Sequence, residues 1–239
     1  MSTSTTPAKT SSGSVYATGA FWERLWRSTG IQSVGLFIIA YVIYGNQPQV
    51  GAPADALVAF YDGDRTRVLT AAVFSGLAVL NLMWFAAALR TTLADAGRDG
   101  WGAAATASSA ALGGLFLLLI TVCAAVGYSI ASSGNDALVS GLNDFAWAGV
   151  VLSSFPRAML VMSSAFGLWR AGLISNALFA AGVAAIVLVL LGGTTWLSDG
   201  FWAPDGVYSR FVSPVICLAW TLVVSWILLT RSPATRAGW

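Results

Sequence analysis

Charged residues are scarce in this sequence of 239 residues, since only 9% are Asp, Glu, Lys or Arg. A water-soluble domain usually carries about 25% charged residues. Histidine is absent, which removes the commonest metal ligand and the usual general base near neutral pH. The two cysteines, Cys123 and Cys217, lie within apolar runs, where packing is a more frequent role than a disulfide or a redox pair. A net charge of +2 without a basic run indicates no nucleic-acid partner.

Sequence fingerprints of common enzyme classes are missing as well. The chain has no Walker loop, no Cys or His spacing for a metal, no Gly-x-Ser-x-Gly elbow and no dinucleotide-binding motif. We therefore expect no metal and no cofactor.

Apolar residues dominate instead, at 57% of the chain. That is too much apolar surface for a water-soluble globule, and the length allows about six membrane spans of roughly 20 residues each. The sequence predicts an all-α, polytopic membrane helix bundle of about six transmembrane helices, arranged as three hairpins within a lipid bilayer. The expected spans are 30–44, 68–89, 103–131, 145–169, 173–191 and 211–230.

The two ends of the chain differ from this transmembrane domain, which we place at 19–231. Residues 1–18 are rich in Ser, Thr and Gly and predict a disordered tail, and 232–239 form a short cytoplasmic tail. Residues 19–27 place aromatic and charged residues at helical spacing, which fits a helix on the membrane surface or the first turns of the first span. The short first span also resembles a signal peptide, but the long polar leader favours a retained span.

Positive charges predict the orientation. Eight of the twelve Lys and Arg fall on one side of the expected spans, namely Lys9, Arg24, Arg27, Arg90, Arg98, Arg170, Arg231 and Arg236. The opposite loops hold Arg65, Arg67 and Arg210. The positive-inside rule then places both termini in the cytoplasm of a plasma-membrane protein.

The fourth expected span carries Pro156 and Arg157 at its middle. Proline cannot donate to the carbonyl four residues earlier and should kink the helix. An intramembrane arginine usually faces the bundle interior or a wet cavity. Helix counting places Asn81 of the second span at a similar depth, so we expect it to meet Arg157, with Thr121 and Tyr41 as further lining groups.

Two interpretations of Arg157 remain open. In one, its guanidinium binds an anionic or carbonyl-bearing ligand in a buried pocket. In the other, it bonds to Asn81, Ser153, Ser154 and freed carbonyls, and so fixes the helix register. Small residues at four-residue spacing on the third span, Ala105, Ser109 and Gly113, predict close helix packing.

The outer loops hold two further groups of candidates. Trp196 and Trp202, in the third outer loop, fit a lid over a hydrophobic ligand or an aromatic belt at the lipid–water boundary. Four outer aspartates are catalytic acid and base candidates, although Asp-Gly turns and a helix N-cap at Asp144 explain them equally. They are Asp62, Asp144, Asp199 and Asp205. The first two outer loops, near Asp55 and Asp136, each fit a short helix with an apolar side that lies on the membrane.

Three segments carry a resemblance to a known family: AFYDGDRTRVL at 59–69, NLMWFAAALR at 81–90 and DGFWAPDG at 199–206. The chain resembles a family of uncharacterised six-span membrane proteins of high-GC Gram-positive bacteria. The resemblance implies the six-span topology and brings no established activity.

Three functions are compatible with these features. The first is a protein that binds a lipid-like or isoprenoid molecule in an outward-opening cavity near Arg157. The second is an integral-membrane enzyme such as a small isoprenoid cyclase, in which an outer Asp protonates the substrate. The third is a structural or immunity-type protein that acts through a membrane partner or as a homo-oligomer. A proton-coupled transporter is disfavoured, because no acid or His lies mid-membrane to relay protons.

Overall fold

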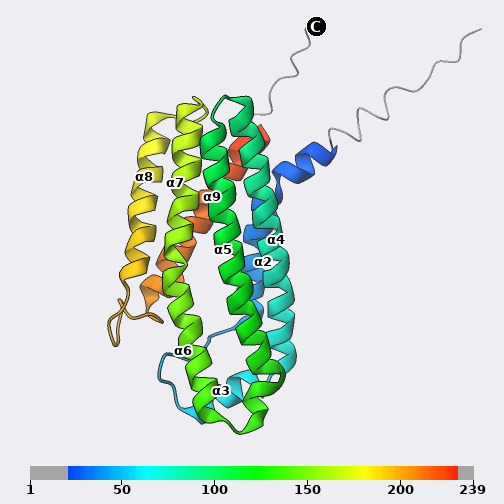
Figure 1. Cartoon of the computed structure of the whole chain (residues 1–239), viewed down its shortest axis with the longest axis vertical. Helices are drawn as coiled ribbons and strands as arrows, with labels where there is room; N and C mark the ends of the chain where they lie inside the picture. The colour runs from blue at the N-terminus through cyan, green and yellow to red at the C-terminus, as the bar shows by residue number, and fades with distance from the viewer. Residues whose placement is uncertain (1–20, 231–239) are drawn as a thin grey trace, which may run out of the picture.

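The computed structural model describes residues 21–230, which form helices and no strands (Figure 1). The predicted all-α helix bundle is therefore confirmed for this range, and the predicted tails 1–18 and 232–239 lie outside it. The longer elements are α2 (Thr29–Tyr44), α3 (Ala54–Tyr61), α4 (Arg65–Asp95), α5 (Asp99–Ala125), α6 (Asp136–Leu152), α7 (Ser154–Arg170), α8 (Asn176–Leu191) and α9 (Ser213–Thr230). Short π- and 3₁₀-helical segments extend them at η1 (Val126–Ile130), η2 (Ala131–Ser133), η3 (Gly192–Thr194) and η4 (Tyr208–Val212).

Five helical segments in the described range are long and apolar enough to cross a membrane. They are Arg65–Asp95, Asp99–Ser133, Asp136–Arg170, Asn176–Thr194 and Tyr208–Thr230. Each contains or closely overlaps one of the expected spans. The segment expected as the first span is α2, which has 16 residues and a length of about 24 Å. It is shorter than the roughly 30 Å of a bilayer's hydrocarbon core.

Residues 21–27 form a helix that a turn at Ser28 separates from α2. Figure 1 shows this helix turned away from the axis of the bundle. Arg27 ties it to the bundle, because its guanidinium pairs with Glu23 at 2.7 Å and donates to the carbonyl of Leu228 at the end of α9. Phe21 and Trp22 remain 60% and 64% exposed. These residues are thus a separate helix and not the first turns of α2.

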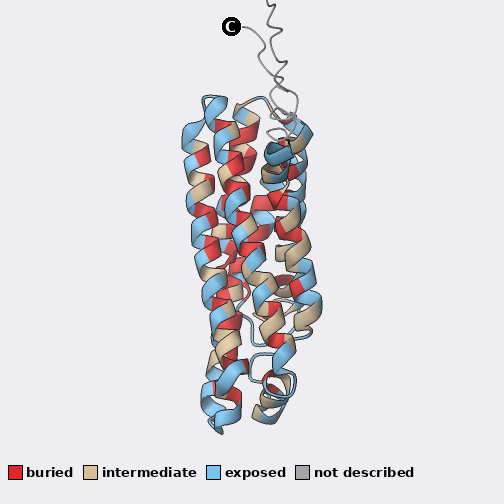
Figure 2. Ribbon diagram, turned by 90° about the vertical axis from the view of Figure 1, so that its right-hand side faces the viewer, coloured by how far each residue is buried: buried red, intermediate tan, exposed pale blue. Residues whose placement is uncertain are grey.

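Helix α5 packs against both α4 and α7 and so lies between them. The predicted small-residue face of α5 mediates the contact with α4. Ser109 is buried and donates to the carbonyl of Leu82, and a Cβ on Gly113 would lie 3.2 Å from Val79. Figure 2 shows the buried residues on the sides of the helices that face one another, with exposed residues outside. Close packing of small residues is how helices associate in lipid.

Helix α3 does not expose an apolar side to the membrane as predicted. Leu57 and Tyr61 are buried in a cluster with Val126 of η1 and Val139 of α6. The expected helix of the second outer loop is also not separate. It begins at Asp136 as α6 and runs directly into the fourth expected span. A second, smaller hydrophobic core, in which these side chains pack against one another, therefore lies at the end of the bundle that holds α3.

Candidate functional site

Arg157 lies on the first turn of α7, just after the α6–α7 helix is interrupted at Ser153. The interruption lies next to Leu152. The carbonyl of Leu152 receives no hydrogen bond from Pro156, because proline has no backbone N–H. The predicted break near Pro156 is thus present, three residues before the proline. Arg157 is only 3% exposed and lies 13 residues from the end of α7, or about 20 Å along the helix.

The guanidinium of Arg157 is held by neutral oxygen atoms. Its Nη2 donates to the carbonyl of Val150 at 2.8 Å and to Ser153 Oγ at 2.6 Å, with Ser154 Oγ at 3.4 Å. Its Nε donates to the carbonyl of Ser153 at 3.2 Å. Its Nη1 donates to Ser213 Oγ on α9 at 3.3 Å. The interrupted helix therefore supplies most of the acceptors from its own turn.

No carboxylate neutralises this charge within residues 21–230, where the ion pairs involve only Arg27, Arg67 and Arg90. A guanidinium has five N–H groups, two of them on Nη1. Ser213 is the one acceptor that Nη1 finds among the described residues, so its second N–H has none. Arg157 thus carries a buried positive charge and one N–H that a further acceptor can satisfy.

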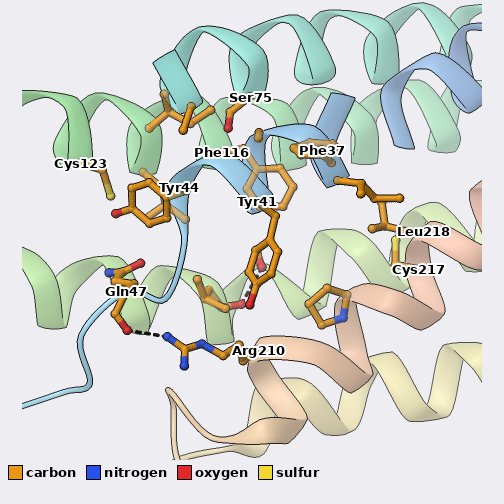
Figure 3. Close-up of a pocket in the computed structure, with 18 of the residues that line it drawn as sticks. Phe37, Tyr41, Tyr44, Gln47, Ser75, Phe116, Cys123, Arg210, Cys217 and Leu218 are labelled. Atoms are coloured by element: carbon orange, nitrogen blue, oxygen red, sulfur yellow. Dashed lines mark hydrogen bonds between the residues drawn. The ribbon is translucent and has the colours of Figure 1, made fainter. Parts of the chain in front are cut away.

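Arg157 also lines a cavity of about 480 Å³. Such a volume is typical of pockets for small molecules. Helices α2, α4, α5, α6, α7 and α9 all contribute to its wall, which is mostly apolar. Figure 3 shows Tyr41, Tyr44, Phe37 and Phe116 around this space, with Gln47 and Arg210 at one end and Cys217 and Leu218 at the other.

The exposed residues of the cavity wall lie on one side only. Ile38 and Tyr41 of α2, Phe211 of η4 and Val215 of α9 are 40–57% exposed. The other lining residues are buried or half-buried. The rings of Tyr41 and Phe211 meet edge to face, with centroids 6.0 Å apart. The cavity therefore approaches the surface of the bundle between α2 and the start of α9.

Polar side chains hold the segment 45–53, which we call the strap, against the end of the cavity away from the chain termini. Arg210 donates to the carbonyl of Gln47, and Trp147 Nε1 donates to the carbonyl of Pro48 at 2.9 Å. Asn143 accepts from Gln47 Nε2 at 3.1 Å and donates to the carbonyl of Gln49. Gly45 and Gln47 of the strap line the cavity themselves. The predicted outward opening is thus at least partly covered.

Tyr61 on α3 extends this polar network beneath the strap. Its hydroxyl donates to Asn143 Oδ1 at 3.3 Å, and the hydroxyl of Tyr44 donates to that of Tyr61 at 3.5 Å. Burial raises the pKa of the Tyr61 phenol above its usual value. The phenol therefore stays protonated near neutral pH and keeps its donor for Asn143.

Two of the residues expected beside Arg157 lie elsewhere. Asn81 donates to the carbonyl of Leu77 on its own helix at 2.9 Å, and the predicted contact with Arg157 is wrong because Leu82, and not Asn81, is the residue of this turn of α4 that lines the cavity. Thr121 is exposed and donates to the carbonyl of Leu117. Neither residue lines the cavity, whereas Tyr41 does.

Trp196 and Trp202 do not line the cavity. The indole of Trp196 donates to the carbonyl of Gly193, and that of Trp202 donates to the carbonyl of Thr194. Trp202 also packs on Tyr208, with ring centroids 4.5 Å apart. Both tryptophans thus bond within their own loop, outside the cavity wall.

The four candidate aspartates do not converge into one acidic site. Asp144 Oδ1 accepts from the backbone N–H of Gly51, and Asp205 Oδ2 accepts from that of Val50, both at 3.3 Å. These two carboxylates thus fasten the strap. Asp62 and Asp199 are exposed, and none of the four lines the cavity. The N-cap expected at Asp144 is wrong, because α6 begins eight residues earlier and is capped by Asn135.

Sequence reasoning missed Ser213, Asn143 and Arg210. Ser213 follows Arg157 by 56 residues, and nothing local in the sequence pairs them. Asn143 lies in the second outer loop, where we expected a separate short helix on the membrane, so its burial inside α6 was not predicted. Arg210 was assigned to an outer loop as a charge only, although it stacks over Trp147 at 5.0 Å while it holds the strap.

Over residues 21–230, the fold and site define an all-helical bundle with membrane-compatible helices, an apolar cavity and a buried arginine without a counter-ion. Comparison of the chain with protein-family models, with curated proteins and with solved structures finds no match. The function is therefore argued from the site itself.

Proposed function

We propose that the protein crosses the plasma membrane six times, with both termini in the cytoplasm, and binds one lipid-like or isoprenoid molecule in its cavity. The ligand presents an anionic or carbonyl oxygen to Arg157 and places its apolar chain along the cavity wall. The observation that carries this proposal is the guanidinium itself, which is 3% exposed, lines the cavity and has only neutral partners among the described residues.

The energetic reason is the cost of the buried charge. An arginine in the middle of a membrane helix costs at least about 2.5 kcal/mol even by the lowest scales. Hydroxyl and carbonyl groups recover part of that cost, but an anion recovers more, because charge-assisted hydrogen bonds are roughly twice as strong as neutral ones. A site that retains such a charge beside a mostly apolar cavity fits a ligand with one polar group and a long apolar part.

The topology rests on helix length and on the cations. Five helical segments fit a bilayer by length and composition, and the shorter apolar helix α2 is the sixth crossing in this proposal. Arg27, Arg98 and Arg170 gather at one end of the bundle, where Arg98 donates to the carbonyl of Arg170. The positive-inside rule makes that end cytoplasmic. The resemblance to a six-span family favours the same arrangement.

The enzyme alternative has less support. A cyclase of the expected kind needs an acid that reaches the buried chain, and no carboxylate lines the cavity among residues 21–230. The structural alternative, in which Arg157 serves only to fix α7 against α9 through Ser213, is the one that experiment must exclude.

Native mass spectrometry of protein extracted in mild detergent tests the proposal. We expect wild-type protein to retain one co-purified lipid-like molecule, and Arg157→Met to lose it while the protein stays folded. Arg65→Met is the matched control, because Arg65 stacks over Tyr128 outside the cavity and its loss should leave the adduct in place. Wild-type protein that carries no adduct from any native extract would contradict ligand binding.

A further inference from the structure

Helices α2 and α9 are in contact at one end of the cavity, and Figure 1 shows them diverging toward the strap. At the near end, a Cβ on Gly30 would lie 1.9 Å from Ser225 Oγ, so the two helices touch closely there. Arg27 also donates to the carbonyl of Leu228 nearby. Toward the strap, the aromatic contact of Tyr41 with Phe211 joins them. The two helices thus form a wedge, and the cavity lies in its open part.

Every exposed residue of the cavity wall sits along this wedge. Ile38 and Tyr41 are three residues apart on α2, and Phe211 and Val215 are four apart on η4 and α9, so each pair follows one helix face. Their side chains are apolar apart from the Tyr41 hydroxyl. In a membrane, such a face meets hydrocarbon rather than water.

The end of the cavity next to the strap is more closed than the side between α2 and α9. Tyr44, Gln47 and Trp147 line it and are buried or half-buried. Arg210 bridges from η4 to the strap carbonyl of Gln47 above them. A molecule in water therefore meets a polar layer of protein, whereas a molecule in the bilayer meets only the aromatic pair.

We propose that the cavity is entered sideways from the hydrocarbon, between α2 and α9, and that the Tyr41–Phe211 pair is the gate of this entrance. This inference rests on the proposed function and specifies its ligand as a bilayer-dissolved, single-chain amphiphile. Phe211 lies in the π-helical turn η4, a rare geometry that is frequent at functional sites. A rotation of either ring opens the wedge without disturbing the contact between Gly30 and Ser225.

The two native thiols provide a direct measure of access. Cys123 and Cys217 are the only cysteines of the chain, and both line the cavity. In proteoliposomes, an N-alkyl maleimide with a long chain approaches from the bilayer, and a sulfonated maleimide approaches from water. Intact-mass measurements over time give the labelling rate for each reagent, and Cys123→Ala isolates the reaction at Cys217.

Tyr41→Ala and Phe211→Ala should each accelerate labelling of Cys217 by the alkyl maleimide about two- to tenfold, the factor that an edge-to-face aromatic contact represents. The sulfonated reagent should show no acceleration. Val215→Trp, which adds bulk at the entrance, should slow the alkyl reagent. Trp226→Ala is the control, since Trp226 is a 65% exposed residue of α9 outside the cavity and its loss should change neither rate.

Two different failures can be told apart. Alkyl-maleimide rates that are unchanged in Tyr41→Ala, Phe211→Ala and Val215→Trp alike would overturn the gate, as would faster entry of the sulfonated reagent. The gate variants can respond as expected while an added fatty acid leaves the labelling rate unchanged. That result would support the entrance and contradict the proposed ligand class. Slower labelling in the presence of the fatty acid would support both.

Discussion

Arg157 shows how one residue sets the chemistry of the cavity. Five donors project from a rigid fork, and the acceptors of four of them lie in the turn at Val150–Ser154 and on Ser213 of α9. A lysine has three donors on a compact head and cannot reproduce this fork. The position is therefore specific for arginine rather than for positive charge.

We expect Arg157→Lys to lose the bound molecule and to be less stable than Arg157→Met. The ammonium would be buried with fewer partners, whereas the thioether of Met removes the buried charge and is apolar. A buried charge that is left without its hydrogen-bond partners typically costs several kcal/mol of stability. Thermal unfolding of both variants in the same detergent measures the order. Equal stability of Lys and wild type would contradict the proposed hydrogen-bond geometry.

At the scale of elements, small residues decide which helices can approach each other. Gly30 allows α2 to reach α9, because a Cβ there would meet Ser225 Oγ at 1.9 Å and Phe85 Cδ2 at 2.7 Å. Ser225 Oγ is buried without a hydrogen-bond partner among residues 21–230, so packing and not hydrogen bonding holds this contact. The contact fixes the closed end of the wedge.

Gly30→Ala should lower the free energy of unfolding by about 1–3 kcal/mol, the usual cost of overpacking. Gly35→Ala is the matched control on the same helix, because a Cβ at Gly35 meets nothing within 4 Å. Unfolding by an anionic detergent, monitored by circular dichroism, gives both values. A Gly35→Ala loss as large as that of Gly30→Ala would mean that α2 does not pack on α9 in this way.

The strap is the second element whose position depends on a few contacts. Asp144→Ala and Asp205→Ala each remove an acceptor for a strap N–H, and we expect each to loosen the strap by about 1 kcal/mol or less, since both bonds are exposed. Limited proteolysis should then cut within 45–53 faster than in wild type. Asp199→Ala is the control, and an equal effect there would contradict the assigned contacts.

For the whole molecule, the number of crossings follows from whether α2 spans the bilayer. Five crossings place the two termini on opposite sides, whereas six place both on one side. Reporter domains that fluoresce only in the cytoplasm, fused separately to each end, should both be bright. A dark N-terminal fusion with a bright C-terminal fusion would show that α2 does not cross.

The sequence predicted those features that depend on local pattern. Apolar runs located the helices, and Pro156 located the interruption. Of the two interpretations left open for Arg157, the one that paired it with Ser153 and Ser154 had these two partners right. The order of helices around the bundle is not local information. For that reason Ser213 was missed. The contact with Asn81 failed because depth along a helix does not say toward which side of the helix a residue faces.

The end of the bundle next to the strap was predicted least well for a related reason. The first half of α6 was interpreted as a separate short helix on the membrane. Asn143 and Val139 instead contact the strap and α3, which only tertiary structure brings together. The cavity arises from this same end, between helices that diverge, and no run of residues encodes it.

In our proposal, Arg157 is retained for a ligand at the expense of stability. The most direct test is the melting temperature of wild type and Arg157→Met, each measured after delipidation and again with the co-purified molecule restored. We predict that delipidated Arg157→Met melts at the same temperature as delipidated wild type or higher, and that only wild type gains stability when the molecule returns. A variant that melts well below wild type, with no ligand-dependent shift in either protein, would show instead that Arg157 serves only to hold α7 against α9.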